Sequence, residues 1–265
     1  MVASTWHYGI TALWWAEFNT DGPEIEYFRQ FLEPGRPALD VACGTGRLLL
    51  PYLRAGLDVD GCDVSPDMIA LCRAAAEREG LAPNLYVQAM HELELPRRYA
   101  TIFVCGAFGL GSTREQDGFA LERMYEHLEP GGLLVLDNEV PYAERAQWLY
   151  WLEDERFALP RPRRNAGARR RGADGAEYEL RSRLVDVDPL EQLITREMQA
   201  FMWRNGELVA EDEHLLTSTL YFRDELVLML ERAGFVEIEV RGDHNDAAPT
   251  REDDFLVFLA RRPAE

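Results

Sequence analysis

Short apolar runs alternate with amphipathic stretches over the first half of the chain. The runs that we assign to strands are Ala38–Ala42, Asp58–Cys62, Asn84–Gln88, Ala100–Cys105 and Leu133–Asp137. Between them, the segments 46–55, 66–79 and 114–128 carry apolar residues at helical spacing. This alternation predicts parallel strands joined by crossover helices.

Local signals support several of these boundaries. Ser65 precedes Pro66, which is the order expected for an N-cap followed by the first helical residue. The segment Glu129-Pro130-Gly131-Gly132 should end the helix before it and turn the chain into the next strand. We therefore expect one helix to begin at Pro66 and another to end near residue 128.

The chain opens with two further helical segments. Within residues 7–19, the aromatic side chains Trp14, Trp15 and Phe18 have helical spacing. Asp21 stands before Pro23 and Glu24, which predicts a capped second helix that runs to about Leu32. Residues 1–36 are thus expected to form an N-terminal helical cap.

The periodicity changes after Asp137. Residues 176–220 alternate polar and apolar side chains in three long stretches, separated by Asp188-Pro189 and Asn205-Gly206. Asn-Gly is a strong hairpin signal because both residues tolerate positive φ, so residues 141–220 should contain an antiparallel insertion. A helix at Arg223–Arg232, its stop at Gly234 and strands at Phe235–Val240 and Phe255–Ala260 then complete a core formed by residues 37–140 and 221–265.

Charge and composition narrow the function. The 265-residue chain has a net charge of -19, and all 28 of its basic residues are arginine. Without lysine, Schiff-base and P-loop lysine chemistry are excluded, and the negative charge disfavours a nucleic-acid partner. The basic run Arg161–Arg171 is the exception, and we expect it to be either a mobile solvated loop or a patch that attracts anions.

Other signals bear on location and metals. The cysteines Cys43, Cys62, Cys72 and Cys105 lie singly in apolar or glycine-rich segments, which predicts no disulfide framework and no zinc site. A metal site built from Asp243, His244 and Asp246 would have suitable donors but no supporting frame, so we expect none. No transmembrane run or signal sequence is evident, which favours a cytoplasmic protein without membrane contact.

A glycine-containing turn follows the first predicted strand. Gly44 and Gly46 would let the backbone approach a ligand, and the next helix starts at Arg47. Asp63 ends the second strand, where a carboxylate can accept both hydroxyl protons of a ribose. A nicotinamide-binding turn would place a third glycine at Leu49, so a dinucleotide-dependent oxidoreductase is the weaker alternative.

The segment Leu39-Asp40-Val41-Ala42-Cys43-Gly44-Thr45-Gly46-Arg47 resembles motif I of the class I methyltransferases, and Gly61–Met68 resembles their second motif. Ala42 replaces the glycine often found first in motif I. The resemblance implies an α/β, Rossmann-like, mostly parallel seven-stranded sheet of order 3-2-1-4-5-7-6. It also implies S-adenosylmethionine (SAM) as cofactor and S-adenosylhomocysteine as product.

The resemblance further implies which residues contact the cofactor. Those expected beside its methionine part, its ribose and its adenine are Asp40, Ala42, Cys43, Gly44, Gly46, Asp63, Val64, Met68, Met90, His91 and Cys105. The insertion and the N-terminal helices resemble the lid of small-molecule methyltransferases, including amino-sugar N-methyltransferases. This likeness favours a small acceptor with a nucleophilic nitrogen or oxygen.

Methyl transfer from a sulfonium is an in-line displacement, so few residues need be catalytic. His214 is the candidate base, because it lies in the lid-like segment and titrates near neutrality. Tyr8 could hydrogen-bond the acceptor. Candidate acceptor contacts are Trp14, Trp15, Phe108, Asn138, Glu139, Tyr221 and Arg223. A cofactor-binding regulatory protein without turnover is the non-enzymatic alternative, and a homodimer is left open.

Overall fold

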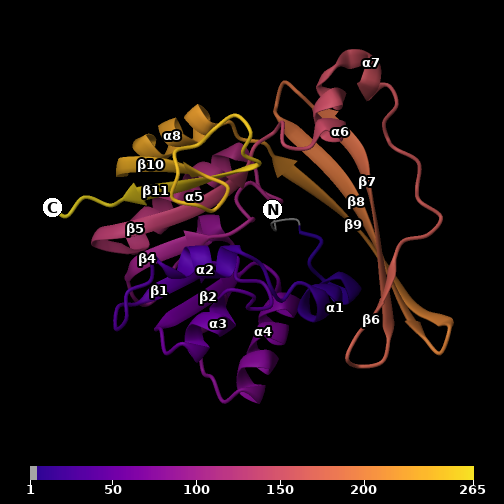
Figure 1. Cartoon of the computed structure of the whole chain (residues 1–265), viewed down its shortest axis with the longest axis horizontal. Coiled ribbons are helices and arrows are strands. Elements are labelled where there is room, and N and C mark those ends of the chain that lie inside the picture. Colours follow the sequence, from indigo (N-terminus) through magenta and orange to yellow (C-terminus); the bar gives the residue numbers. More distant parts are fainter. Residues whose placement is uncertain (1–4) are drawn as a thin grey trace.

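The computed structural model describes residues 5–265 and contains two separate sheets (Figure 1). The larger sheet has seven strands in the order β3-β2-β1-β4-β5-β11-β10. Only β11 runs against its neighbours, β5 and β10. The predicted order and topology are therefore confirmed. The strands are β1 Ala38–Val41, β2 Val59–Asp63, β3 Leu85–Val87, β4 Tyr99–Val104, β5 Leu128–Glu139, β10 Val236–Gly242 and β11 Phe255–Arg261.

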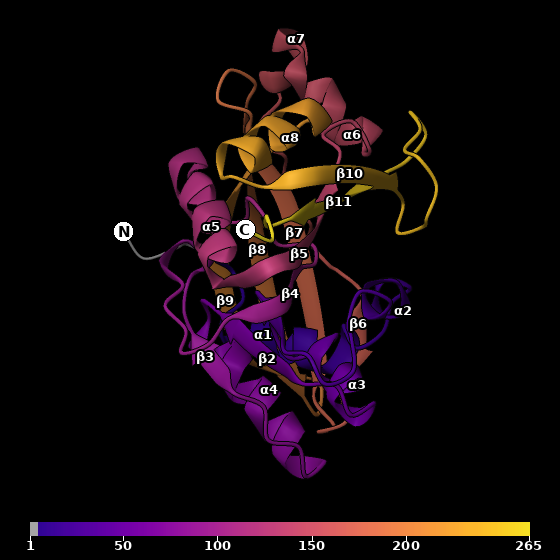
Figure 2. The same ribbon diagram turned by 90° about the vertical axis from the view of Figure 1, so that its left-hand side faces the viewer.

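Helices cover both faces of this sheet, as its apolar strands require. On β4, Ile102 and Val104 pack with one cluster of buried side chains, whereas Phe103 between them packs with another. Figure 2 shows α5 and α2 on opposite sides of the strands. One face is covered by α2 Glu24–Arg29, α3 Leu49–Arg54 and α4 Pro66–Arg78, and the other by α5 Arg114–His127 and α8 Arg223–Arg232.

The starts of two helices follow from their capping residues. The Ser65 hydroxyl accepts a hydrogen bond from the Met68 amide at 3.2 Å, and Pro66 is the first residue of α4, as predicted. At the start of α5, Thr113 and Gln116 form a capping box. The helix ends at His127, but Glu129–Gly132 lies within β5 rather than before it, with an irregular register against β4.

The second sheet is the predicted antiparallel insertion. Its strands follow one another in sequence order: β6 Arg169–Arg171, β7 Glu177–Asp188, β8 Leu193–Arg204 and β9 Glu207–Thr219. Asn205 and Gly206 have φ values of 52° and 84°, as a tight hairpin with a matching twist requires. Three short helical segments that precede this sheet were not predicted: α6 Arg145–Trp148, η2 Leu149–Trp151 and α7 Glu153–Arg156.

Helix α1, Gly9–Phe18, lies between the two sheets and contacts α4 as well as β7, β8 and β9 (Figure 1). Its first amides are held from both sides. The Gly9 amide donates to Asp67 Oδ2 at 2.8 Å, and the Ile10 amide donates to Asp212 Oδ2 at 2.8 Å. Two carboxylates at a helix N-terminus also complement its dipole. The N-terminal segment is therefore fixed to the core and to the insertion together.

Two local predictions were wrong. Pro23, not Asp21, is the N-cap of α2, and the helix ends at Arg29 rather than near Leu32. The Asp21 carboxylate instead accepts the amide of Gly22 next to it. The Asp21 side chain therefore stabilises a local turn and does not cap the helix.

The Arg161–Arg171 run is not a loop throughout, because its last three residues form the edge strand β6. Arg169 lies 3.5 Å from the ring centre of Trp203, and Arg170 lies 4.1 Å from that of Phe18. Arg171 pairs with Glu177. The guanidinium groups of all three residues of β6 are therefore paired with other side chains of the same chain.

The division into a cap of residues 1–36, a core of 37–140 with 221–265, and an insertion of 141–220 stays a prediction. Its first four residues lie outside the described part of the chain. Within residues 5–265, no helix has both the length and the apolar character needed to cross a membrane.

Candidate functional site

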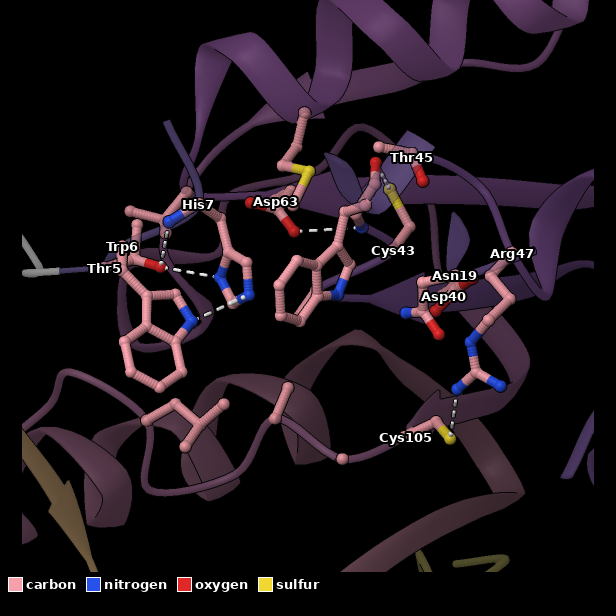
Figure 3. Close-up of a pocket in the computed structure, with 18 of the residues that line it drawn as sticks. Thr5, Trp6, His7, Asn19, Asp40, Cys43, Thr45, Arg47, Asp63 and Cys105 are labelled. Atoms are coloured by element: carbon pink, nitrogen blue, oxygen red, sulfur yellow. Dashed lines mark hydrogen bonds between the residues drawn. The ribbon is translucent and has the colours of Figure 1, made fainter. Parts of the chain in front are cut away.

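A cavity of about 410 Å³ opens at the carboxyl ends of β1, β2 and β4. Open α/β sheets bind ligands at this edge, and the volume falls within the range of small-molecule sites. Figure 3 shows Asp63 between two groups of labelled residues, with Trp6 and His7 on one side and Arg47 and Cys105 on the other. The lining comes from the sheet edge, the N-terminal segment, α1 and the antiparallel sheet.

The turn after β1 adopts a left-handed backbone. Ala42, Gly44 and Gly46 have φ values of 60°, 56° and 90°. A methyl group added at Gly44 would meet nothing within 4 Å, so this glycine leaves open space beside the cavity. At Gly46 it would lie 2.8 Å from Cys72 Sγ and 2.9 Å from Leu50 Cγ. Gly46 is thus needed for close packing of the turn against α3 and α4.

We expect Ala42→Gly to stabilise the protein. A non-glycine residue at φ 60° places its Cβ near the following carbonyl oxygen, which costs about 1 kcal/mol. Removing the Cβ should therefore raise the free energy of unfolding in urea by about 1 kcal/mol. A less stable glycine variant would show that the Ala42 side chain contributes packing that outweighs the backbone strain.

The Asp63 carboxylate is well prepared to bind hydroxyl groups. Its Oδ2 accepts the Gly44 amide at 2.9 Å and its Oδ1 accepts the Ser65 amide at 2.8 Å. Each oxygen retains a second lone pair, and the residue lines the cavity. Burial raises the pKa of Asp63, and the two backbone hydrogen bonds oppose that shift. These two acceptor oxygens fit the ribose hydroxyls of the expected cofactor.

The opposite end of the cavity holds a network of charges. Arg47 Nη1 donates to Glu24 Oε1 at 2.6 Å, and Arg47 Nη2 approaches Cys105 Sγ at 3.5 Å. Burial raises the pKa of Asp40 well above its ordinary value, and the positive charge of Arg47 opposes this shift. Asp40, Arg47 and Cys105 all line the cavity. This end offers the Asp40 carboxyl group and the Arg47 guanidinium as hydrogen-bonding partners for a zwitterionic group.

Asp137 supports this network from behind. Its Oδ1 accepts the Gly106 amide at 2.5 Å, and its Oδ2 lies 3.4 Å from Cys105 Sγ and 2.8 Å from His244 Nε2. Burial, followed by the charge of Asp137, raises the pKa of the Cys105 thiol. His244, for which the sequence suggested no chemistry, therefore orders the loop after β4.

The residues predicted to surround the adenine lie together near Asp63. Val64, Met68 and Met90 line the main cavity. His91 lines a smaller adjoining cavity of about 40 Å³ with Val64 and Met90. Its Nε2 is 3.1 Å from Gln116 Nε2, which fixes the ring against α5. Except for Gly46, all of the predicted cofactor contacts line one of these two cavities.

The N-terminal segment contributes Thr5, Trp6 and His7 to the lining. His7 Nε2 accepts the Trp6 indole N–H at 3.1 Å, so it carries no proton, and Nδ1 must then donate to Thr5 Oγ1 at 2.8 Å. Burial lowers the pKa of His7 to about 4. Its ring also meets Trp15 edge-on, with centroids 4.9 Å apart. His7 is thus held neutral as a structural element of the site.

The antiparallel sheet supplies Arg196 from β8 and Leu216 and Ser218 from β9. Arg196 pairs in register with Leu216. Leu110 adds the loop after β4, which forms an isolated bridge with Ser218. The insertion therefore lines the cavity directly, opposite the glycine-containing turn.

The two predicted catalytic residues lie beside the cavity rather than in its lining. His214 is two residues before Leu216 on β9 and so shares its face of the sheet. The His214 ring lies 6.3 Å from that of Tyr8, and its buried Nε2 has no hydrogen-bond partner within residues 5–265. Burial, with added repulsion from Asp63, raises the pKa of Tyr8. Tyr8 is therefore protonated at neutral pH, and both catalytic roles stay predictions.

Of the predicted acceptor contacts, only Trp15 lines the cavity. Trp14 packs with Ile10 and Tyr178, and Phe108 belongs to the core. The Asn138 amide donates to the carbonyl oxygens of Glu139 and Tyr221.

The other three predicted acceptor contacts are also placed away from the cavity lining. Tyr221 is buried, and its hydroxyl donates to Asp117 at 2.5 Å. Arg223 is exposed beside Asp224. Burial raises the pKa of Glu139, although Arg196 lowers it in part. A role for these residues in acceptor binding stays a prediction without support from the cavity lining.

The sequence interpretation did not single out a set of lining residues: Thr5, Trp6, Asn19, Arg47, Leu48, Leu110, Arg196, Leu216 and Ser218. Arg47 stands inside motif I and could have been included. Arg196, Leu216 and Ser218 carried no local signal, because they enter the site only through the way the insertion packs on the core.

Comparison with known proteins agrees with this geometry. Residues 38–132 match the family model described as a methyltransferase domain. Over 100 residues the chain is 33% identical to a dTDP-3-amino-3,4,6-trideoxy-alpha-D-glucopyranose N,N-dimethyltransferase of Streptomyces venezuelae, covering 37% of this chain and 40% of that protein. It is 31% identical over 149 residues to a ubiquinone biosynthesis O-methyltransferase of Xanthomonas axonopodis, covering 49% and 58%.

A solved structure shares the fold over the whole chain. The sugar N-methyltransferase KedS8 from Streptoalloteichus sp. superposes with a TM-score of 0.68 and 21% sequence identity, covering 99% of this chain and 98% of that one. The match includes the antiparallel insertion as well as the core. Residues 38–132 thus form a methyltransferase domain, and the whole chain has the fold of class I, SAM-dependent methyltransferases.

Proposed function

We propose that this enzyme methylates an amine nitrogen of a small molecule. The observation that carries the proposal is the composition of the cavity. It joins the motif I turn and Asp63 to the antiparallel sheet, yet its lining offers few groups that could remove a proton at neutral pH. An amine attacks through its lone pair while neutral, whereas an alcohol needs a base to become a good nucleophile.

The cofactor side of the proposal rests on the fit described above. Asp63 would accept the ribose hydroxyls, the Gly44 turn would leave room for the backbone to approach, and Val64, Met68, Met90 and His91 would surround the adenine. Asp40 and Arg47 would face the ammonium and carboxylate of the methionine part. When bound, SAM supplies an electrophilic methyl group on a sulfonium.

The titratable residues of the lining support a mechanism without a dedicated base. His7 is neutral at pH 7, but its Nε2 is occupied by the Trp6 indole. A hydrogen bond with Cys72, followed by burial, raises the pKa of the Cys43 thiol, and burial raises that of Cys105, which keeps both thiols protonated. The carboxylates Asp40 and Asp63 remain, and both lie on the cofactor side. The protein would therefore act by orienting the acceptor and excluding water.

The acceptor would enter between the N-terminal segment and the antiparallel sheet. Trp15, Leu110 and Leu216 supply apolar contact, whereas Asn19 and Ser218 supply polar groups. This volume suits a small molecule rather than a polymer, and the net charge of -19 disfavours nucleic acid. The proposal includes a cytoplasmic location, because all four cysteines have free thiols, as is usual in reducing compartments.

The proposal predicts how turnover depends on pH. For an alkylamine acceptor, kcat/KM should rise with pH until the pKa of the amine itself, because only the neutral amine reacts. For an arylamine, which is already neutral, kcat/KM should stay flat between about pH 6 and 9. The measurement is S-adenosylhomocysteine release from p-aminobenzoate and D-glucosamine, each run beside its hydroxyl counterpart, p-hydroxybenzoate and D-glucose.

Turnover of the hydroxyl compounds without turnover of the amines would refute nitrogen as the target. A fall in kcat/KM below about pH 6.5 with the arylamine would instead indicate a protein base. In that case His214→Phe should remove the inflection and identify His214 as that base.

A further inference from the structure

We infer that the acceptor carries an anionic group, a carboxylate or a phosphate, which binds to Arg196 at the end of the cavity formed by the antiparallel sheet. This inference rests on the proposed methyl transfer to a small molecule and specifies the class of that molecule. It starts from the charged residues that line the cavity and from how each of them is paired.

Four charged side chains line the cavity: Asp40, Arg47, Asp63 and Arg196. The first three stand at or just beyond the ends of β1 and β2, where the cofactor is expected. Arg47 is paired with Glu24 at 2.6 Å, both side chains are largely buried, and Arg47 stands on the side where the cofactor is expected. Arg196 alone of these four comes from the insertion, and so it faces the acceptor space.

The hydrogen bonds of Arg196 leave most of its guanidinium free. Both are made by Nη2, to Gln147 Oε1 at 2.5 Å and to Glu144 Oε2 at 3.2 Å. Within the described chain, no hydrogen bond is found for Nε or Nη1. The Gln147 side chain is neutral, and 56% of the Glu144 side chain is exposed to solvent. The two carboxylates near the cation, Glu144 and Glu139, both belong to residues that are open to solvent.

Other arginines of the same sheet are paired differently. Arg183 donates two hydrogen bonds to Glu197, and Arg181 donates to Glu179. The Glu197 and Glu179 side chains are only 5% and 1% exposed. The sheet therefore neutralises these cations with buried carboxylates, and Arg196 beside them departs from that arrangement.

An oxyanion that replaced exposed Glu144 on Nη2 would meet two parallel donors, because Nη2 shares one edge of the guanidinium with Nε and the other with Nη1. A guanidinium offers parallel N–H donors whose spacing matches a carboxylate or a phosphate, and such bidentate pairs are stronger than neutral hydrogen bonds. Ser218 adds a hydroxyl donor from the neighbouring strand. Buried Gln147 fixes Nη2, so a bound anion would displace only the exposed Glu144.

The first test measures anion binding by calorimetry to protein saturated with S-adenosylhomocysteine. Inorganic pyrophosphate represents phosphate-bearing acceptors and malonate represents carboxylate-bearing ones. We expect at least one probe to bind the wild type, and Arg196→Gln to weaken that binding by about 10- to 100-fold. Which probe binds identifies the anion. Arg251→Gln, which alters a fully solvated arginine, is the matched control and should bind as the wild type does.

The second test compares p-aminobenzoate with p-aminobenzamide as acceptors. The wild type should show the higher kcat/KM with the carboxylate, and Arg196→Gln should remove that preference while S-adenosylhomocysteine affinity stays unchanged. Arg196→Lys, which keeps the charge, should restore part of the preference. A merely structural role of Arg196 would change both acceptors equally.

Failure of both anions to bind the wild type, or equal binding to Arg196→Gln, would overturn the inference. If S-adenosylhomocysteine itself did not bind, the proposed methyl transfer would fail instead. The two failures are therefore distinguishable in the same calorimetric series.

Discussion

Replacing Asp63 with alanine should weaken SAM binding by about 30- to 700-fold, equivalent to about 2 to 4 kcal/mol. The reason is the loss of an acceptor that is oriented by two backbone amides, those of Gly44 and Ser65, and faces the cavity. Isothermal calorimetry measures the affinity directly. Asp63→Asn retains one carbonyl oxygen for an amide donor and should show a smaller loss.

A matched control separates binding from folding. Asp60 stands on the same strand and is also buried, but it accepts hydrogen bonds from Arg97, Tyr99 and Asn84 and does not line the cavity. Asp60→Asn should lower the melting temperature and leave the SAM affinity of the folded protein unchanged. Wild-type SAM affinity in Asp63→Ala would show that the ribose lies elsewhere.

The sequence carried enough information to predict which residues line the sheet-edge half of the cavity, where the cofactor is expected. Asp40, Gly44 and Asp63 lie at the ends of strands that the apolar runs identify, and strand ends converge at one edge of a parallel sheet. Likewise, Ser65 and the Asn205-Gly206 pair act through their own backbone neighbours. Features of this kind depend on residues close in sequence, so a single chain suffices to find them.

The acceptor half could not be predicted in the same way. Arg196 enters the cavity because β8 pairs with β9 and the sheet they form packs across α1. Asn138 and Tyr221 had suitable positions at the end of β5 and before α8, but they hydrogen-bond to each other and to Asp117 inside the core. Which side chains face the cavity was decided by packing between segments far apart in the sequence.

The strongly basic run illustrates a related limit. Composition alone indicated a loop or an anion-binding patch. Glu177 and Glu179 on the next strand, and the aromatic rings of Trp203 and Phe18, instead receive its arginines. The number of arginines in the run therefore overestimates the positive charge that is available to bind an external anion.

Lowering the pH should release the N-terminal segment from the cavity. The pKa of docked His7 is about 4, against an ordinary value of about 6.5. The released segment therefore takes up a proton that the docked segment does not accept. The contribution of neutral His7 to the free energy of docking is complete above about pH 6.5. It decreases as the pH falls, by up to about 3 kcal/mol at about pH 4.

The Trp6 indole N–H reports this release, because it donates to His7 Nε2 and an imidazolium cannot accept it. In spectra of protein with ¹⁵N-labelled tryptophan, the Trp6 signal should lose its bonded shift below about pH 6. His7→Gln offers an amide oxygen that does not titrate, so its Trp6 signal should stay constant over the same range. SAM affinity is the poorer readout, because protonation of Asp63 would lower it as well. A Trp6 signal that moved equally in the wild type and in His7→Gln would show that His7 is not the group whose protonation releases the segment.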